Sequence, residues 1–412
     1  MSKRIVIIGA GFAGLWSALS AKRLINLRNQ QNSIKILVIT PEPSLVLRPR
    51  LYEANSAGMT HHLGELFDSA GIEFFQGKVD TIDTKAHAVH AQATSGLEPT
   101  TSISYDRLIL AAGSSVRQPQ GVAGLREFAF DIDALDSAAR LEEHLNGLPS
   151  SAESPGRDTV VVCGAGFTGI ELAAELPKRL LGLIANPRII MVESADEIGP
   201  GLGPGPRPVI TQAMKELQVE VRTGAAVSSV DAEGLTLATG DRIETKTIIW
   251  TAGVVATPLT QQIDGPKDSF CRLHVDQSLR TLSAEHVYAT GDAAHALADD
   301  KGHHALMSCQ HALQLGRVSG YNAAADLLGE QTVEYSQAAY ACCLDLGPCG
   351  AVIGRGWERE VSLTGDRAKR VKEYINRKLI YPPVDVWEAL NLANPVGPDS
   401  DELFEHILQV VG

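Results

Sequence analysis

The chain has 412 residues, of which 44% are apolar and 5% aromatic, and its formal net charge is -13 at pH 7. This length and apolar content suit a globular protein of about two or three domains with a sizeable core. The negative charge argues against nucleic acid or an anionic membrane surface as a partner, because both are polyanions that attract basic patches. The sequence has no run of about 18 apolar residues, so we expect no membrane span.

Two features predict a cytoplasmic location. The first predicted strand begins by Ile5, which leaves no room ahead of it for the apolar segment of a signal peptide. The cysteines include no C-x-x-C pair and have no regular spacing, as expected for free thiols in a reducing compartment. They are Cys163, Cys271, Cys309, Cys342, Cys343 and Cys349.

The chain opens with an apolar strand, Arg4 to Ile8, followed by a turn with the G-x-G-x-x-G spacing and a predicted helix. Such glycines permit a tight turn, let a pyrophosphate approach the helix N-terminus and let the helix pack closely on the sheet. The next strand ends at Thr40, where the pattern usually has a ribose-binding acid, and Glu42 is displaced by two positions. We therefore expect a pyrophosphate cradle with a weakened ribose contact. Its glycines are Gly9, Gly11 and Gly14.

The segment after this unit predicts a loop, a helix and a small sheet. The loop carries Arg48 and Arg50, and the helix is expected around His62 to Ala70. Alternating apolar residues between 79 and 104 predict a β-meander. The segment Tyr105 to Ser114 reads as an apolar strand that runs into small residues, including Gly113, so that its backbone can come close to a ligand.

A second strand–turn–helix–strand unit spans Val160 to Glu193, after a linker-like stretch from 150 to 157. Glu193 ends the second strand, where a carboxylate can accept hydrogen bonds from both ribose hydroxyls of an adenosine. This context favours a dinucleotide site over the alternative of a simple tight turn. The glycines of this unit are Gly164, Gly166 and Gly169.

The rest of the chain predicts further elements. Residues 199–208 are rich in glycine and proline and predict an exposed loop, followed by a helix over 209–217, a strand over 219–222 and a meander over 225–243. The strand 247–253 ends at Gly253, and a later strand delivers Gly291 and Asp292. We expect a long helix from about His304 to Leu328 and another from 365 to 379. The last residues, 399–412, include four acids and no Lys or Arg.

The order and spacing of these motifs resemble those of the two-dinucleotide-binding-domain flavoproteins, and most closely the type II NADH dehydrogenases. The strings that carry the resemblance are RPRLYEANSAG, GAGFTGIELAAEL, IIWTAGV and YATGDAA, within about the first 330 residues. The resemblance implies an α/β fold with two Rossmann-like domains and a smaller C-terminal α+β module. The expected limits are 1–116 with 256–330 for FAD, 117–255 for NAD(P)H, and 331–412 for the module.

The resemblance also implies roles for residues in each unit. Asp292 matches an acid near the flavin phosphate and ribityl chain, although it could instead cap a helix. Glu171 matches a glutamate near the nicotinamide, although an acid is also favourable in the first turn of a helix. Gln310, with Cys309, is expected near the isoalloxazine, because the resemblance places the N-terminus of the long helix at the flavin. Cofactor contacts are also expected from Arg48, Gly113, Gly253 and Gly291.

Glu193 predicts NADH rather than NADPH, because no Lys or Arg lies between Ser194 and Pro206 to meet a 2'-phosphate. The histidines at 295, 303, 304 and 311 are close in sequence, but no Cys or carboxylate cluster accompanies them, and we expect no metal. Cys342, Cys343 and Cys349 of the C-terminal module, together with Cys163, suggest an alternative, the sulfide:quinone oxidoreductases, whose paired cysteines attack sulfide beside the flavin. Buried inert thiols are the favoured interpretation.

The sequence thus predicts an FAD-dependent oxidoreductase that takes hydride from NADH and reduces a quinone-like or other small acceptor. A biosynthetic flavoenzyme of the same fold, acting on a specific small molecule, and a flavin redox sensor or electron-transfer protein are the alternatives. The tail departs from the family, whose members usually end in basic or aromatic amphipathic helices. Its acidic composition disfavours peripheral membrane contact and suits a soluble protein or a homodimer contact.

Overall fold

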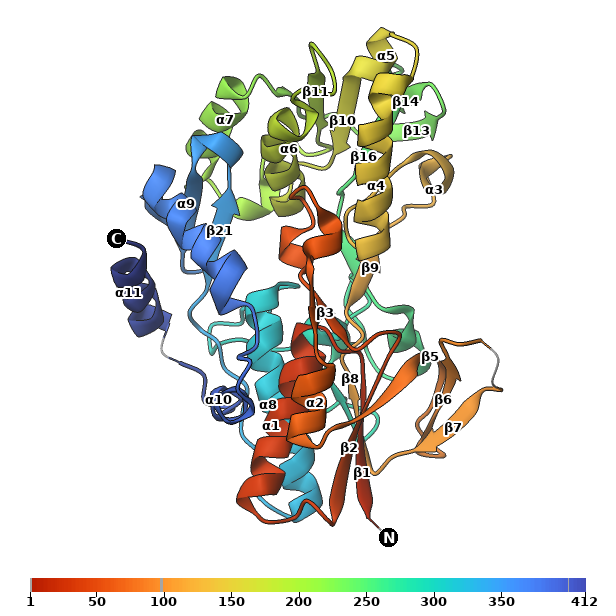
Figure 1. Ribbon diagram of the computed structural model, residues 1–412, viewed down its shortest axis with the longest axis vertical. Coiled ribbons are helices and arrows are strands. Elements are labelled where there is room, and N and C mark those ends of the chain that lie inside the picture. Colours follow the sequence, from red (N-terminus) through yellow and green to blue (C-terminus); the bar gives the residue numbers. More distant parts are fainter. Residues whose placement is uncertain (1, 97–98, 399) are drawn as a thin grey trace.

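The computed structural model describes residues 2–96, 99–398 and 400–412. Two α/β halves stack along the long axis of the molecule, and the C-terminal segment packs against one side of them (Figure 1). The half with the N-terminus is lower in this view, and the half that contains the second glycine-rich unit is upper. The predicted α/β fold with two halves and a smaller C-terminal segment is confirmed.

The lower half is built on a seven-stranded sheet in the order β19-β8-β1-β2-β5-β6-β7. Its first five strands in this order are parallel, and β5, β6 and β7 form an antiparallel meander, as predicted for this part of the chain. The central strand β1 is buried from its third residue on because helices and the meander cover its two faces. The strands are β1 Lys3–Ile8, β2 Ile34–Thr40, β5 Glu73–Asp83, β6 Ala88–Ala93, β7 Thr101–Ser104, β8 Arg107–Leu110 and β19 Val287–Ala289.

The upper half has a four-stranded parallel sheet in the order β12-β11-β10-β16 and a three-stranded antiparallel sheet, β13-β14-β15. The second sheet is the meander predicted over 225–243. All five residues of β10 are buried, as expected for a central strand with both faces covered. The strands are β10 Thr159–Cys163, β11 Arg188–Val192, β12 Glu220–Arg222, β13 Val227–Asp231, β14 Gly234–Leu237, β15 Arg242–Glu244 and β16 Thr247–Trp250.

Helices and short strands complete the structure. The helices are α1 Phe12–Leu27, α2 Gly64–Ala70, α3 Leu125–Phe128, α4 Leu135–Gly147, α5 Pro155–Asp158, α6 Phe167–Leu180, α7 Arg207–Glu216, α8 Cys309–Leu328, α9 Gly365–Tyr374, α10 Val386–Leu392 and α11 Ser400–Val411. The short strands are β3 Ser44–Val46, β4 Thr60–His62, β9 Ser114–Val116, β17 Val254–Ala256, β18 Leu273–His274 and β20 Ala294–His295. Among the described residues no helix combines the length and the apolar character needed to cross a membrane.

Helices α1 and α8 pack side by side against the first sheet (Figure 1). Gly316 and Gly320 of α8 lie so close to α1 that a Cβ on either would overlap a carbonyl oxygen, of Ala13 or of Ser17. The hydroxyls of Ser17 and Ser319 are 3.0 Å apart in the same contact. Small residues therefore allow the two helix backbones to touch.

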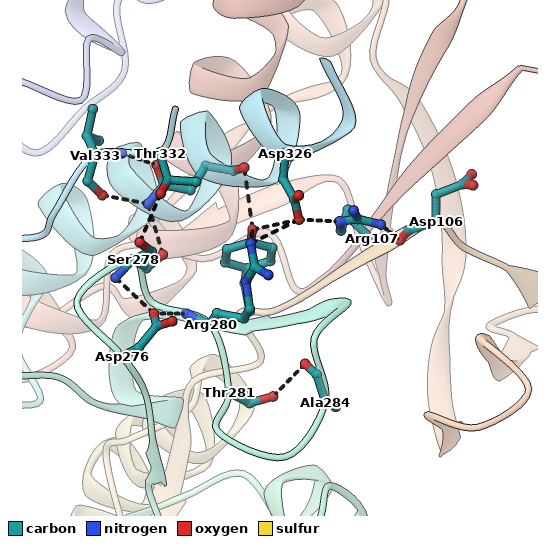
Figure 2. Close-up of polar contacts among 12 residues, drawn as sticks. Asp106, Arg107, Asp276, Ser278, Arg280, Thr281, Ala284, Asp326, Thr332 and Val333 are labelled. Carbon is teal, nitrogen blue, oxygen red and sulfur yellow. Dashed lines mark hydrogen bonds and ion pairs between the residues drawn. The ribbon is translucent and has the colours of Figure 1, made fainter. Parts of the chain in front are cut away.

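The far end of α8 is fixed to the sheet by one carboxylate. Asp326 accepts hydrogen bonds from Arg107 Nε of β8 at 2.6 Å, from Arg280 Nη2 at 3.1 Å and from the Tyr288 hydroxyl of β19 at 3.2 Å. Figure 2 shows Arg107 and Arg280 converging on Asp326 from opposite sides. These contacts fix the position of α8 along the sheet, and so the position of its N-terminus.

The C-terminal segment forms an antiparallel sheet, β21 Ala341–Asp345, β22 Ala351–Arg355 and β23 Glu360–Thr364, that packs against α9. This sheet lies beside α6, where Gly347 approaches the carbonyl oxygen of Ala174 so closely that a Cβ would overlap it. The acidic tail folds as α11, which packs on α9 and buries Ile407 (Figure 1). The domain limits expected at residues 116, 256 and 330 stay predictions.

Three local predictions need correction. The long helix begins at Cys309 rather than His304, because Ser308 is its N-cap and accepts a hydrogen bond from the backbone of His311. The helix expected from His62 begins at Gly64, since residues 60–62 pair with β3. The glycine- and proline-rich loop contains one 3-10 turn, Pro200–Leu202, and buries the side chain of Leu202.

The α1–α8 contact predicts the effect of a single methyl group. In Gly320→Ala the new Cβ must displace the backbone of Ser17, so we expect a loss of about 1–3 kcal/mol in the free energy of unfolding. Gly147→Ala, whose Cβ would meet open space at the end of α4, is the control and should change stability little. Urea unfolding measures both variants, and equal stability of the two would contradict the proposed packing constraint.

Candidate functional site

A cavity of about 2810 Å³ runs between the two halves and the C-terminal segment. Both glycine-rich turns open onto it, and the start of α8 and parts of α9 and α11 complete its wall. The predicted residues on this wall are Gly9, Gly11, Arg48, Gly113, Gly166, Glu171, Gly291, Asp292 and Gln310. The structure therefore brings most of the predicted site into one space.

The first glycine turn, between β1 and α1, gives each glycine a separate role. Gly9 has φ +104°, a conformation that favours glycine, and Gly14 lies against the carbonyl oxygen of Gly9, where a Cβ would overlap it. A Cβ on Gly11 would meet open space, and Gly11 lines the cavity. The turn therefore presents bare backbone at the N-terminus of α1, which suits a pyrophosphate.

The second glycine turn repeats this geometry between β10 and α6. Gly164 has φ +111°, Gly169 packs against its carbonyl oxygen, and Gly166 faces open space. A smaller cavity of about 230 Å³ adjoins the turn. Among the predicted residues, it is lined by Gly164, Gly166, Glu193 and Gly253.

Glu193 is buried at the end of β11 and is hydrogen-bonded to the second turn. Its carboxylate accepts a bond from the backbone N–H of Ala165 at 2.7 Å and another from that of Ala195 at 2.8 Å. The side chain thus holds the glycine turn in shape and also lines the smaller cavity. The hydrogen bonds from the two backbone N–H groups explain why an acid suits this position, apart from any contact with a ribose.

Asp292 lies in a short 3-10 turn, Gly291–Ala293, rather than at the start of α8. Its Oδ2 accepts hydrogen bonds from Ser114 Oγ at 2.6 Å and from Arg48 Nη1 at 3.4 Å. Arg48 also pairs with the carboxylate of Asp133, which comes from the segment before α4. The alternative of a cap on the long helix is excluded for Asp292, since Ser308 holds that place.

In the first unit, Glu42 does not take the place of the ribose-binding acid that the sequence lacks at Thr40. Thr40 lines the cavity at the end of β2, whereas Glu42 is exposed and does not line it. Residues 77–80 of β5 lie on the same wall and were not predicted. Only the pairing of β5 with β2 brings them there, and the local sequence carries no signal of that contact.

Glu171 is buried on α6 and is ion-paired across the cavity wall. Its carboxylate lies 2.8 Å from Lys372 Nζ of α9 and accepts a hydrogen bond from the backbone of Asp345 at 2.9 Å. Burial raises the pKa of Glu171 to about 7, against the opposing effect of Lys372. Although burial opposes it, the Glu171 carboxylate raises the pKa of Lys372.

Asp345 extends this group of charges toward the lower half. It accepts a hydrogen bond from the hydroxyl of Tyr52 at 3.0 Å and pairs with Lys369 Nζ at 2.5 Å. The sequence singled out Glu171 alone, because nothing in the local pattern marks a buried lysine on α9 as its partner. The amphipathic spacing of α9 was the one signal that Lys372 faces inward.

The N-terminus of α8 points its first residues at the cavity. Gln310 and Cys309 both line it, and Gln314 lies one turn further along. Ser308 caps the helix and its Oγ is also 3.0 Å from His311 Nδ1. Burial lowers the pKa of His311 to about 4, so this ring is neutral at pH 7.

The cysteines are all free thiols. Burial raises the pKa of Cys342 to about 11 and that of Cys163 and Cys343 to about 12. Since the thiolate is the reactive form, these side chains stay protonated at neutral pH. This agrees with buried, inert thiols rather than a sulfide-attacking pair.

The histidines considered as possible metal ligands stack on other aromatic rings instead. His295 stacks on His304 with centroids 3.9 Å apart, and His303 stacks on Trp357 at 4.6 Å. Burial lowers the pKa of His295 to about 4. Within the described part of the chain, no three His, Cys, Asp or Glu side chains are grouped as metal ligands.

Comparison with known proteins agrees with this geometry. The family model described as pyridine nucleotide-disulphide oxidoreductase matches residues 3–316. The chain belongs to this family. The matched region contains both glycine turns and Asp292 and ends within α8.

Two relatives of this oxidoreductase cover most of the chain. An NADH dehydrogenase-like protein of Mycobacterium tuberculosis is 40% identical over 388 residues, which are 93% of this chain and 95% of the relative. The type II NADH:quinone oxidoreductase NdhA of the same species is 30% identical, over 70% of this chain and 66% of that protein. The predicted resemblance to type II NADH dehydrogenases is thereby confirmed.

The fold also has a close counterpart among solved structures. The structure of NDH2 from Plasmodium falciparum in complex with NADH superposes with a TM-score of 0.77 at 14% identity, over 95% of this chain and 97% of that one. At this identity the likeness speaks for the fold. It extends through the C-terminal segment, which the family model does not reach.

Glu193 yields a prediction for nucleotide binding. Replacement by Ala removes a charged acceptor from the smaller cavity, and the loss of such hydrogen bonds should weaken NADH binding roughly 10- to 100-fold. Steady-state kinetics give the KM for NADH, and calorimetry gives its Kd. Glu244→Ala, on the exposed face of β15, is the matched control. An unchanged KM for NADH in Glu193→Ala would contradict the assignment.

Proposed function

We propose that this protein is an FAD-dependent NADH oxidoreductase that passes electrons to a quinone-like small molecule. The observation that carries the proposal is the meeting of two glycine-rich turns, each at a helix N-terminus, on one cavity. A single-nucleotide enzyme needs only one such turn. The names of the relatives, NADH dehydrogenase-like protein and type II NADH:quinone oxidoreductase, agree with this interpretation.

The lower half fits FAD. Gly11 leaves space for a pyrophosphate at the start of α1, and Asp292 offers a carboxylate to the hydroxyls of a ribityl chain. Arg48 and Ser114 hold that carboxylate in place through their hydrogen bonds. When bound, FAD supplies the hydride-accepting and electron-donating chemistry, and the protein supplies its orientation.

The upper half fits NADH. Gly166 leaves space for the second pyrophosphate, and Glu193 presents a carboxylate at the smaller cavity, where it can accept ribose hydroxyls. The same carboxylate would repel a 2'-phosphate, and no Lys or Arg lies between Ser194 and Pro206. These features support NADH as the donor.

Glu171 is proposed as the group that exchanges a proton with the acceptor. Reduction of a quinone to a quinol requires two electrons and two protons, and Glu171 is a carboxyl on the cavity wall whose pKa lies near 7. Lys372 and the backbone of Asp345 fix its position. Gln310, at the start of α8, is proposed to bind the acceptor by its amide.

We also propose a cytoplasmic location, on the basis of the composition. The charge of -13 and the four acids within residues 399–412 support a cytoplasmic protein, with peripheral membrane contact disfavoured. A homodimer is compatible with these features.

The proposed function is tested by half-reactions. Purified protein should be yellow, and anaerobic NADH should bleach its flavin absorbance much faster than NADPH at equal concentration. Stopped-flow mixing of the reduced protein with quinones, oxygen and ferredoxin-type proteins should show rapid reoxidation by quinones. Protein that binds no FAD, or that neither nicotinamide reduces, would overturn the proposal.

The pKa of Glu171 predicts a pH profile. Because Glu171 is mostly protonated below about pH 7 and ionised above it, the rate of reoxidation by a quinone should fall as pH rises through this value. Glu171→Gln keeps the size and the acceptor for the backbone of Asp345 but cannot titrate, so the step near pH 7 should disappear. Glu175→Gln, one turn along α6, is the control. A step that persists in Glu171→Gln would assign it to another group.

A further inference from the structure

Arg317 on α8 stacks over the indole of Trp16 on α1, with the guanidinium carbon 4.4 Å from the ring centroid. Both side chains line the main cavity. The Nε of Arg317 and the Nε1 of Trp16 are both buried, and among the described residues neither has a hydrogen-bond partner. Two donors in one stacked pair thus lack acceptors, which is a costly arrangement unless a further group accepts from them.

Arg317 also differs from the other buried cations of this cavity. Arg48 pairs with Asp133 and Asp292, and Lys372 pairs with Glu171. Within the described ranges the polar contact of Arg317 is a weak one, 3.5 Å from Nη1 to Gln314 Oε1. Burial lowers the pKa of Arg317 to about 10, so the group is still charged at neutral pH. A partly buried charge of this kind favours the binding of an anion.

Apolar side chains also line this cavity near α8. They include Leu313, one turn before Arg317 on α8, and Leu392, Pro395 and Val396 at and after the end of α10. Gln314 Nε2 donates to the carbonyl oxygen of Pro395 at 2.6 Å, which holds the segment after α10 against α8. A ligand that reaches this part of α8 therefore meets apolar side chains beside the Arg317 cation, to which its anionic part can bind.

The helix sets the length of such a ligand. Arg317 follows Gln310 by seven residues, which is close to two turns, so both side chains project from the same face of α8. The rise between them is about 10 Å, and both side chains lean toward the N-terminus of the helix, so the lean leaves this spacing largely unchanged. A bicyclic aromatic ring with an acidic substituent spans this distance.

We infer that the electron acceptor is a quinone-type ring bearing an acidic group, and that Arg317, held by Trp16, binds that group while the ring lies at the Gln310 end. This inference rests on the proposed function and names the substrate class for the same cavity. The planar fork of the guanidinium matches a carboxylate in two hydrogen bonds, and the indole N–H is a further donor beside it. Arg317 is then a specificity-determining residue for the acceptor.

The kinetic test compares one ring with and without the acid. NADH-reduced holoenzyme is mixed anaerobically with 1,4-naphthoquinone or with 1,4-naphthoquinone-2-carboxylate. In Arg317→Gln, kcat/KM for the carboxylate should fall about 10-fold or more, while that for the neutral quinone should change less than about 2-fold. Comparing each quinone with itself across variants cancels the difference in their redox potentials. Arg317→Lys should restore part of the loss, because it keeps the charge without the fork.

A binding test needs no turnover. Calorimetry measures the Kd of 1-hydroxy-2-naphthoate and of 1-naphthol on the oxidised holoenzyme. The acid should bind more tightly, and Arg317→Gln should remove that preference. Trp16→Phe keeps the stacked ring and loses the N–H, so it should weaken the acid by a smaller factor. Arg23→Gln, on α1 and outside the cavity lining, is the control and should leave both constants unchanged.

The outcomes separate the two proposals. If NADH fails to bleach the flavin, the proposed function fails, and the naphthoate measurement still decides whether Arg317 binds an acid. If the flavin is reduced but Arg317→Gln affects both quinones equally, or neither, the inference about the acceptor is overturned. Should Arg317→Gln lose its flavin, Arg317→Lys and Trp16→Phe are compared with the unmodified protein in the same two measurements. Equal effects of these variants on the acidic and the neutral ligand would count against the inference.

Discussion

The contact between α1 and α8 is the constraint on which the site depends. Gly316 and Gly320 let the two helix backbones touch, and the hydrogen bonds from Arg107, Arg280 and Tyr288 to Asp326 fix α8 along the sheet. As a result, two helix N-termini open on one cavity although almost 300 residues separate them in sequence. Both termini contribute partial positive charge there, which favours phosphate at α1 and negative charge near the start of α8.

Local sequence was sufficient to predict the parts of the site that are local in structure. Each glycine turn joins a strand to the helix that follows it, so the spacing of Gly9, Gly11 and Gly14 carries the whole geometry. Glu193 was also predictable, because parallel pairing of β10 and β11 places the end of the second strand beside the first turn. Its bond to the backbone of Ala165 is a consequence of the same pairing.

The residues that were missed owe their position to distant pairs. Lys372 meets Glu171 across about 200 residues of sequence, and Arg48 meets Asp133 between segments that no motif connects. Helix α8 was predicted too long because residues 304–308 have no strong breaker, and only the cap at Ser308 marks the true start. Periodicity indicates which face of a helix is buried, but it does not identify the residue that lies opposite.

The group formed by Glu171, Lys372, Asp345 and Lys369 has a consequence for electron transfer. With both carboxylates ionised and both amines protonated, the four side chains sum to zero charge, and Glu171, Lys372 and Asp345 are buried while Lys369 is partly exposed. An electron that arrives beside them makes a net negative charge, which a proton on Glu171 would cancel. Electron arrival and proton uptake therefore favour each other, and the reduction potential of a molecule bound here should depend on pH through the protein as well as through its own protons.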